Sequence, residues 1–476
     1  MARAFSFLID GSLETGSRQV TVRAPFDGSE VGQCGDATSA EVERAIAAAY
    51  AARAAMAALP AWRRAEALRA LEAALAAAAE EIALLMAAEA GKPIRDARGE
   101  VARARLTLRT AAEEAVRISG EVSNLDVAAS GEGRFSVSRR FPVGVIAGIT
   151  PFNFPLNLVL HKLAPAIASG NTIVIKASPR CPLSALRLGE LARPLDLPRG
   201  AINILSGGAE AVQQLVADER VAMVSFTGSA EVGWKLKAAA GRKRVALELG
   251  GNAANIVHRD ADLELAAERL SAGGFAYAGQ SCISVQRVYI HRDVYHKLRG
   301  QLIERAAKLR VGDPRDEATD VGPMITIEAA ERAEAWIGAA IKAGARLACG
   351  GTRNGNQLTP AILEQVPPNA QIYAEEAFAP VMLLESFDDT ERVLAAANAG
   401  RYGLQAGVFT RDLDFALRAF QALEVGAVLL NEVSSWRIDP MPYGGVKDSG
   451  FGREGLRSAI EEMTELRLLL VRRSGK

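Results

Sequence analysis

Two residues near the middle of the chain have the types and the surroundings that acyl chemistry needs. Glu248 opens the segment Glu248-Leu249-Gly250-Gly251, and Cys282 closes the segment Gly279-Gln280-Ser281-Cys282. A cysteine attacks an aldehyde carbon only as the thiolate, and a glutamate can activate the water that later hydrolyses the thioester. The neighbouring glycines would let the backbone approach a ligand closely. The alternative for each segment alone is structural, because a lone cysteine is usually a small buried hydrophobe and a Gly-Gly pair usually marks a turn.

A third candidate is Asn153, in the segment Thr150-Pro151-Phe152-Asn153-Phe154-Pro155 that follows an apolar run. The two prolines restrict the backbone on either side of the asparagine. An amide N–H2 held in this way could stabilise an oxyanion, whereas the alternative is an ordinary turn residue.

Two further strand ends could bind a dinucleotide. Lys176 ends the apolar run Ile173-Val174-Ile175, and Gly228-Ser229 lies between an apolar run and a helix expected to begin near Ala230. The lysine could reach ribose hydroxyls or a 2′-phosphate, and the free N–H groups of a helix N-terminus favour a pyrophosphate. The glycine spacing differs from Gly-x-Gly-x-x-Gly. A solvated lysine and an ordinary strand-to-helix turn therefore stay as alternatives.

The elements that must position these residues alternate between strands and helices. After short strands in residues 5–35, the stretch from Ser39 to about Ile118 has helical periodicity and is broken at Gly91-Lys92-Pro93. Beyond Val143, short β-branched runs alternate with helical segments, which indicates a mostly parallel, doubly wound sheet. The runs expected to be strands are residues 143–149, 172–175, 201–205, 223–226, 285–290, 381–384 and 427–430.

Composition excludes several classes of partner. Lysine plus arginine balance aspartate plus glutamate at 56 each, so no basic field attracts nucleic acid or an anionic membrane. No uncharged apolar run is long enough to cross a membrane, and the N-terminus lacks a long apolar signal region. The four cysteines show no close pairing and the four histidines show no metal-ligand spacing. We therefore expect a cytoplasmic enzyme without a metal.

Together these segments resemble the aldehyde dehydrogenase superfamily over nearly the whole chain. The matching pieces, in the family's order, are residues 150–155, the strand ending at Lys176, and residues 226–233, 248–251, 279–282, 375–380 and 442–454. The resemblance implies an α/β fold with a Rossmann-like cofactor domain, an α/β catalytic domain and a small β oligomerisation arm. The expected ranges are 1–120 and 142–248 for the cofactor domain, 249–455 for the catalytic domain, and 121–141 with 456–476 for the arm, whose last strand would be 467–471.

The resemblance also implies a mechanism. Cys282 would attack an aldehyde, and Asn153 with the backbone N–H of Cys282 would hold the oxyanion of the thiohemiacetal. After hydride transfer to the nicotinamide, Glu248 would activate water to hydrolyse the thioester. Two alternatives are a CoA-acylating dehydrogenase, whose members typically lack the base at the position of Glu248, and a non-catalytic member of the fold.

The implied cofactor is NAD or NADP. Lys176 would contact the adenosine ribose, Ser229 the pyrophosphate and Glu376 the nicotinamide ribose, with Phe378 near the ring. Many members that prefer NAD carry a glutamate three residues after the lysine, where this chain has Pro179 followed by Arg180, so NADP is also expected to be accepted. The full expected set is Thr150, Pro151, Phe152, Lys176, Ser178, Pro179, Gly207, Phe226, Gly228, Ser229, Leu249, Gly250, Glu376 and Phe378.

The implied substrate is a small aldehyde in a tunnel lined by Arg109, Ser281, Trp436 and Arg437. Similar relatives act on polar aldehydes such as lactaldehyde, glyceraldehyde 3-phosphate, phosphonoacetaldehyde and succinate semialdehyde. An arginine suits an anion. A solvated Arg109 and an Arg437–Asp439 pair would instead suit a neutral aldehyde, and both readings stay open. The implied assembly is a homodimer or homotetramer.

Overall fold

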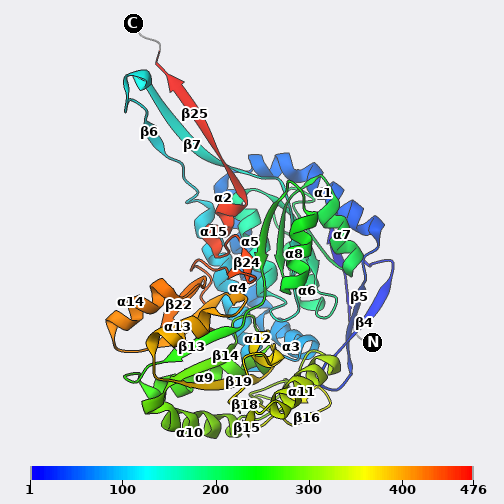
Figure 1. The fold of residues 1–476 in the computed structure, drawn as a ribbon. Helices are drawn as coiled ribbons and strands as arrows, with labels where there is room; N and C mark the ends of the chain where they lie inside the picture. The colour runs from blue at the N-terminus through cyan, green and yellow to red at the C-terminus, as the bar shows by residue number, and fades with distance from the viewer. Residues whose placement is uncertain (1–2, 474–476) are drawn as a thin grey trace.

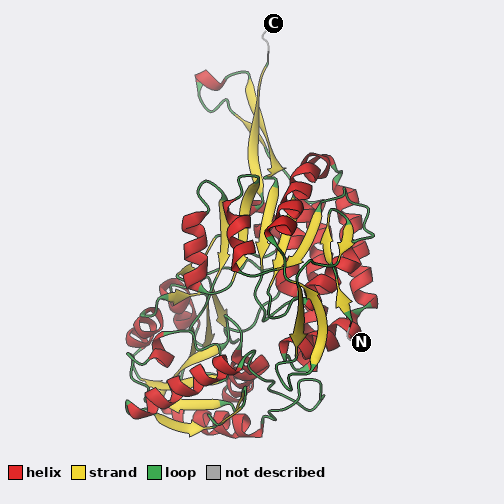
Figure 2. Cartoon of the chain, turned by 90° about the vertical axis from the view of Figure 1, so that its right-hand side faces the viewer, coloured by secondary structure: helices red, strands yellow, loops and turns green. Residues whose placement is uncertain are grey.

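Two large sheets with helices packed around them form the body of the molecule, and a third, smaller sheet projects from it (Figures 1 and 2). The computed structural model describes residues 3–473. Both large sheets consist mainly of parallel strands joined by helices. The expectation of an α/β fold with mostly parallel sheets is confirmed.

The first sheet has the strand order β24-β12-β11-β8-β9-β10-β2-β3. Its five central strands are parallel: β8 (Val145–Ile149), β9 (Thr172–Ala177), β10 (Ile202–Ser206), β11 (Val221–Thr227) and β12 (Arg244–Glu248). The chain builds outward from β8 through β9 and β10, then crosses to the other side of β8 for β11 and β12. Such a reversal leaves a crevice at the carboxyl ends of the two middle strands, where doubly wound sheets bind ligands.

Both ends of the chain complete this sheet. The hairpin of β2 (Phe7–Ile9) and β3 (Ser12–Glu14) extends it beyond β10, and β24 (Gly450–Phe451) pairs antiparallel with β12 at the other edge. The short β1 (Ala4–Phe5), β4 (Gln19–Arg23) and β5 (Glu30–Gly35) form a separate sheet. The strands expected in residues 5–35 are therefore present.

Four helices cover the stretch from Ser39 to Ala115, as its periodicity predicts. They are α1 (Ser39–Ala58), α2 (Ala61–Ala77), α3 (Ala79–Ala90) and α4 (Ile94–Ala115). The break falls where expected, because α3 ends at Gly91 in the left-handed conformation and Pro93 precedes α4. The other helices of this unit are α5 (Asn157–Ser169), α6 (Leu183–Ala192), α7 (Ala209–Ala217), α8 (Ala230–Ala239) and α15 (Leu456–Glu462).

The second sheet has the order β15-β18-β19-β14-β13-β21-β22, and only β15 runs antiparallel to its neighbour. Its strands are β13 (Ala253–Val257), β14 (Val285–His291), β15 (Arg346–Cys349), β18 (Ala361–Glu364), β19 (Val381–Phe387), β21 (Gln405–Phe409) and β22 (Ala427–Leu430). Its helices are α9 (Leu263–Phe275), α10 (Arg292–Lys308), α11 (Ile327–Lys342), α12 (Gln371–Ala374), α13 (Thr390–Asn398) and α14 (Leu413–Ala422). The three strands expected in this half are present.

The projecting sheet is made of β6 (Val122–Asn124), β7 (Arg134–Pro142) and β25 (Thr464–Arg472), all antiparallel (Figure 1). Residues 121–141 and the chain's last strand therefore form one arm, as expected. Two elements near the expected boundaries pack with the first unit: β24 pairs with β12, and α15 contributes Leu456 and Ile460 to its core. The domain boundaries themselves stay predictions.

Across residues 3–473, no helix combines the length and the apolar character that crossing a membrane requires.

Candidate active site

The carboxyl ends of three neighbouring strands form one wall of a cavity of about 410 Å³. The loop after β8 contributes Pro151, Phe152 and Asn153, while β11 ends in Thr227 and β12 ends in Glu248. These residues meet because the strands are parallel neighbours, with Thr227 directly opposite Glu248 in the register. The cavity lies at the strand-order reversal, where the topology predicts a ligand.

The second unit supplies the opposite wall through the turn that carries Cys282. Close backbone packing holds this turn against the Glu248 segment. A side chain at Gly251 would begin 2.2 Å from the carbonyl oxygen of Cys282, and one at Gly279 would begin 2.1 Å from the carbonyl oxygen of Ala379. Only glycine allows these approaches. The glycines beside both reactive residues are therefore needed for packing as well as for access.

Asn153 is 4% exposed, and its side-chain amide donates a hydrogen bond to the carbonyl oxygen of Gln280, at 3.1 Å. The loop is anchored from α4: one carboxylate oxygen of Glu100 accepts hydrogen bonds from the backbone N–H groups of Leu156 and Asn157, both at 3.0 Å. Lys92 pairs with the other oxygen of Glu100 and also lies over the Phe154 ring. The amide therefore points at the segment that carries Cys282 and has little freedom to move.

Glu248 is buried, and its Oε2 atom has no hydrogen-bond partner among residues 3–473. Burial, and then the carboxylate of Glu454, raise the pKa of Glu248 well above its ordinary value. A carboxyl group in such a site is a stronger base once ionised than an exposed one. It can therefore take a proton from water.

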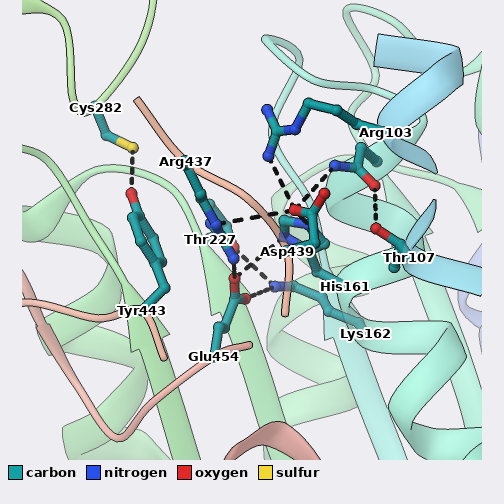
Figure 3. A network of polar contacts seen from close by, with 11 residues as sticks. Arg103, Thr107, His161, Lys162, Thr227, Cys282, Arg437, Asp439, Tyr443 and Glu454 are labelled. Atoms are coloured by element: carbon teal, nitrogen blue, oxygen red, sulfur yellow. Dashed lines mark hydrogen bonds and ion pairs between the residues drawn. The ribbon is translucent and has the colours of Figure 1, made fainter. Parts of the chain in front are cut away.

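Cys282 lies within reach of a phenol. The hydroxyl of Tyr443 is 3.3 Å from Sγ (Figure 3). Burial raises the pKa of the Cys282 thiol to about 12, and the hydrogen bond from Tyr443 acts in the opposite direction. The thiolate needed for attack therefore depends on groups that stabilise its charge in place.

A network of polar side chains, called the inner network below, surrounds Oδ1 of the buried Asp439 and reaches the cavity wall through Arg103, His161 and Arg437 (Figure 3). It lies 2.9 Å from Nη2 of Arg103, 2.7 Å from Nε2 of His161, 3.4 Å from the Asn157 amide and 3.9 Å from Nε of Arg437. Although burial opposes ionisation, His161 and the two arginines hold the pKa of Asp439 well below its ordinary range.

Glu454 holds the other side of this network. Its carboxylate lies 3.0 Å from Nζ of Lys162, 3.3 Å from Nδ1 of His161 and 3.5 Å from Nη2 of Arg437. Despite burial, Lys162 first and then His161 keep the pKa of Glu454 well below its ordinary value. Lys162 also donates a hydrogen bond to Thr227, at 2.7 Å. Two ionised carboxylates thus fix the directions of the surrounding cations.

The sequence matches one protein family over almost its full length. Residues 13–469 match the model of the aldehyde dehydrogenase family. The chain belongs to the aldehyde dehydrogenase family. The predictions of the family and of an NAD(P)-dependent aldehyde dehydrogenase are therefore confirmed.

Three relatives illustrate the similarity. This aldehyde dehydrogenase is 43% identical to a 3-sulfolactaldehyde dehydrogenase of Priestia aryabhattai over 98% of both chains. Its fold matches that of aldehyde dehydrogenase 21 from Physcomitrella patens, solved in complex with the reaction product succinate, with a TM-score of 0.98 and 42% identity over 99% of both chains. It also matches a glyceraldehyde-3-phosphate dehydrogenase of Methanocaldococcus jannaschii in complex with NADP, with a TM-score of 0.92 and 38% identity over 96% of this chain and 100% of that one.

The structure brings most of the expected site residues of this aldehyde dehydrogenase into one cavity. Those that line it are Pro151, Phe152, Asn153, Gly228, Ser229, Glu248, Leu249, Gly250, Ser281, Cys282, Glu376, Phe378 and Arg437. Phe226 lies directly behind Gly228 of the cavity wall, since a side chain at Gly228 would begin 2.5 Å from the Phe226 ring. Thr150 is buried behind the wall, and its N–H donates to the carbonyl oxygen of Lys176. Further along the same sheet edge, Lys176 lies near the end of β9, Ser178 and Pro179 follow that strand, and Gly207 follows β10.

Two expected substrate residues lie elsewhere. Arg109 is exposed on α4 and is absent from the cavity wall, whereas Arg103, six residues earlier on another face of the helix, lines the cavity. Trp436 is 41% exposed, and its neighbour Ser435 lines the cavity instead. The expected contacts of Arg109 and Trp436 with the substrate are corrected accordingly, because helix and loop direction, which spacing alone does not give, decide which neighbour points inward.

Several cavity residues were not identified from the sequence: Arg103, Phe154, Asn157, Leu158, His161, Thr227, Tyr443 and Glu454. Tyr443 and Glu454 lie in the glycine-rich segment 442–454, which indicated only a bend. Reciprocal backbone hydrogen bonds join the two residues and set them side by side. A phenol and a carboxylate among glycines were the available signal. Within residues 3–473, no cluster of His, Cys, Asp and Glu side chains is arranged to hold a metal ion.

Proposed function

We propose that this aldehyde dehydrogenase oxidises a small anionic aldehyde to its carboxylic acid, with Cys282 as nucleophile and Glu248 as the base for hydrolysis. The observation that carries the substrate class is the charge of the inner network. Arg103, Arg437 and Lys162 pair with two ionised carboxylates, Asp439 and Glu454, so these five side chains carry one positive charge in excess. A substrate anion at this end would balance the charge.

Arg103 is the cation best suited to receive that anion. Its side chain is 32% exposed and lines the cavity, and its Nε–H has no partner among the described residues. Arg437 also has an Nε–H without a hydrogen-bond partner among the described residues, but it is only 6% exposed and pairs with Glu454 and Asp439. A guanidinium with a free N–H suits a carboxylate, sulfonate or phosphonate. The named substrate of the Priestia relative and the bound succinate of the Physcomitrella protein agree with an anionic substrate.

The proposed reaction begins with the Cys282 thiolate attacking the aldehyde carbon. The side-chain amide of Asn153 and the backbone N–H of Cys282 hold the oxyanion of the thiohemiacetal, and removing such a donor typically costs about 100- to 1000-fold in rate. NAD(P)⁺, when bound, would supply the acceptor for hydride. Loss of hydride from the thiohemiacetal carbon would then leave a thioester on Cys282. Glu248 then takes a proton from the water that attacks the thioester, and the acid leaves while the thiolate is restored.

The residues present suit a dinucleotide. The N-terminus of α8 lies at Ser229 without a side-chain cap, so its N–H groups are free for a pyrophosphate. Lys176 is 6% exposed and makes no ion pair within residues 3–473, and burial lowers its pKa to about 8. Near the reaction centre, Phe152 and Phe378 pack edge to face and Glu376 lines the cavity. We propose that Lys176 and Glu376 contact the two riboses.

We further propose that NADP is accepted. Pro179 and Arg180 are exposed beyond the end of β9, so neither of these two positions carries a carboxylate that would repel a 2′-phosphate. The substitution Pro179→Glu should shift the ratio of kcat/KM for NADP over NAD towards NAD, because the new charge repels the phosphate. Steady-state rates with both nucleotides test this, and an unchanged ratio would contradict it.

The substrate class is tested with matched aldehydes that differ only in a terminal anion, monitored at 340 nm. Arg103→Gln should raise KM for the anionic aldehyde by about 10- to 100-fold, since a hydrogen bond to a charged group contributes roughly 1.5–3 kcal/mol. It should leave KM for the neutral aldehyde nearly unchanged. Arg109→Gln, on the exposed face of the same helix, is the control. An equal effect of Arg103→Gln on both aldehydes would overturn the anionic assignment.

The competing function is acyl transfer to CoA. Adding CoA to the same assay distinguishes acyl transfer from hydrolysis. A CoA-acylating enzyme needs the thiol of CoA for turnover, whereas a hydrolytic enzyme needs only water. The presence of Glu248 in the cavity supports hydrolysis.

We also propose a homo-oligomer in the cytoplasm. The arm strand β25 exposes Leu466, Leu468 and Leu470 on one face, at 50–64% exposure. An apolar row of this kind favours burial against another surface. The four cysteines are unpaired, which suits a reducing compartment.

A further inference from the structure

Tyr443 occupies a place that the proposed reaction does not yet use. It is 4% exposed, and its backbone is fixed by two hydrogen bonds to Glu454, of 3.0 and 2.6 Å. Its ring packs with Ile283 and Leu404, and the guanidinium of Arg437 lies 3.6 Å from the ring centroid. Backbone, apolar neighbours and a cation on one ring face together leave the ring a single position.

The hydroxyl of Tyr443 has one recorded partner among the described residues, Sγ of Cys282 at 3.3 Å (Figure 3). Burial raises the pKa of Tyr443 well above its ordinary value, so the phenol keeps its proton near neutral pH. A neutral phenol beside a thiolate can only be the donor. The direction of the hydrogen bond is therefore fixed when the sulfur is charged.

The sulfur needs such a donor. Burial raises the pKa of the Cys282 thiol to about 12, and the carboxylates of Glu376 and Glu248 raise it further. The hydrogen bond from Tyr443 is the strongest influence in the opposite direction, followed by the charge of Arg437. Arg437 contributes twice, since its positive charge on the ring face also makes the hydroxyl a better donor.

We propose that Tyr443 is a catalytic residue whose hydroxyl donates a hydrogen bond to Sγ of Cys282, stabilises the thiolate and aims it into the cavity. The thiol proton leaves to water, while the tyrosine keeps its own proton throughout. After attack the sulfur is bonded to carbon and is a poor acceptor, so the hydrogen bond weakens as the charge moves to the oxyanion. The proposal rests on the proposed role of Cys282 as nucleophile.

The test measures the thiol itself rather than turnover. The rate at which iodoacetamide alkylates Cys282, identified by mass spectrometry, is followed against pH without aldehyde or cofactor. Tyr443→Phe should raise the apparent pKa of Cys282 by about 1 to 2 units, as expected for a lost hydrogen bond to a charged group. Below both pKa values the alkylation rate should fall roughly 10- to 100-fold. Tyr295→Phe, which removes a hydroxyl hydrogen-bonded to Glu364, should change neither the apparent pKa of Cys282 nor its alkylation rate.

A second variant guards against a fold defect in Tyr443→Phe. 3-Fluorotyrosine at position 443 keeps the hydroxyl and nearly the size of the side chain but makes the phenol a stronger donor, so the pKa of Cys282 should fall. An unchanged pKa of Cys282 in this variant, or in a folded Tyr443→Phe protein, would overturn the inference. Cys282→Ser tests the nucleophile separately from the role of Tyr443. Retained turnover in Cys282→Ser would refute Cys282 as the nucleophile. If Cys282→Ser loses turnover but the alkylation pKa of Cys282 is unchanged in Tyr443→Phe, only the role of Tyr443 is refuted.

Discussion

At the scale of single residues, burial has the largest effect on the pKa values of the groups in the site. Glu248 is buried, Glu376 and Cys282 are half-buried at the cavity wall, and burial is the main cause that raises the pKa of each. Two of these groups then rely on a specific partner: Glu376 on the N–H of Gly251 and Cys282 on the Tyr443 hydroxyl. The chemistry of the site is therefore set by pairs of residues rather than by single ones.

Glu248→Gln should separate the two halves of the reaction. If Glu248 acts only on the attacking water, reduced cofactor should still form in a rapid burst, and turnover should then stall as the acyl-enzyme accumulates. Stopped-flow absorbance at 340 nm gives the burst, and mass spectrometry should locate the acyl group on Cys282. A variant with neither burst nor adduct would refute the role in hydrolysis, and normal turnover would leave Glu248 a structural residue.

Glu376→Gln should stabilise the protein in a pH-dependent way. Burial raises the pKa of Glu376 to about 7 from 4.5, despite its hydrogen bond from Gly251. Below pH 4.5 the Glu376 carboxyl is protonated in both the folded and the unfolded protein and does not lower the free energy of unfolding. As pH rises from 4.5 to 7, it lowers the free energy of unfolding increasingly, because the carboxyl ionises more readily in the unfolded protein. The gain in unfolding free energy should reach at most about 3 kcal/mol above pH 7. Urea unfolding at pH 5 and pH 8 tests this, and an equal gain at both would contradict it.

The sequence identified those site residues whose neighbours in the chain form a recognisable motif. Cys282, Glu248 and Asn153 were selected because each stands in a glycine- or proline-rich segment. Arg103 and His161 were missed because their direction depends on Asp439, which lies 336 and 278 residues away from them. No local pattern encodes a contact over that distance. The same reason explains the choice of Arg109, whose helical face only the packed structure reveals.

At the scale of elements, the loop between β8 and α5 is controlled from α4. Glu100 takes the place of a helix cap by accepting hydrogen bonds from the N–H groups at Leu156 and Asn157, and it is itself paired with the buried Lys92. The Asn153 loop is thus connected to α4, the helix that also carries Arg103. Alternation of strands and helices predicted both elements, but not this connection between them.

Glu100→Ala should therefore cost both stability and rate. Removing one partner of a buried ion pair typically costs about 3–5 kcal/mol, because the other charge is left unpaired. The double variant Lys92→Met/Glu100→Leu should recover part of that stability, since no buried charge remains, while the fall in kcat caused by a looser Asn153 loop should persist, because leucine offers the loop no acceptor. Urea unfolding and steady-state kinetics provide the two measurements. Full recovery of kcat in the double variant would contradict the positioning role.

At the scale of the whole molecule, the arm is the feature that a single chain does not explain. β25 is an edge strand, with β7 on one side and no strand recorded on the other within residues 3–473. Exposed edge strands with apolar side chains favour pairing with another chain. The exposed row Leu466, Leu468 and Leu470 therefore supports assembly through the arm.

Leu468→Glu/Leu470→Glu should shift the protein to a smaller assembly, because two carboxylates would have to be buried with the row. Sedimentation velocity gives the mass directly. Ile327→Glu, at a 52% exposed position at the start of α11, is the control. A monomeric wild-type protein, or a double variant with the wild-type mass, would refute assembly through this face.

The contribution of both chain ends to one sheet has a consequence during synthesis on the ribosome. β12 emerges early, but its partner β24 emerges only after the whole second unit has been translated. Throughout that interval the nascent cofactor sheet carries an open strand edge, the kind of surface on which unfinished chains aggregate. A premature stop before Gly450 would therefore leave a sheet with a permanent edge, and we expect such a product to be cleared by chaperones and proteases rather than to persist as a shorter enzyme.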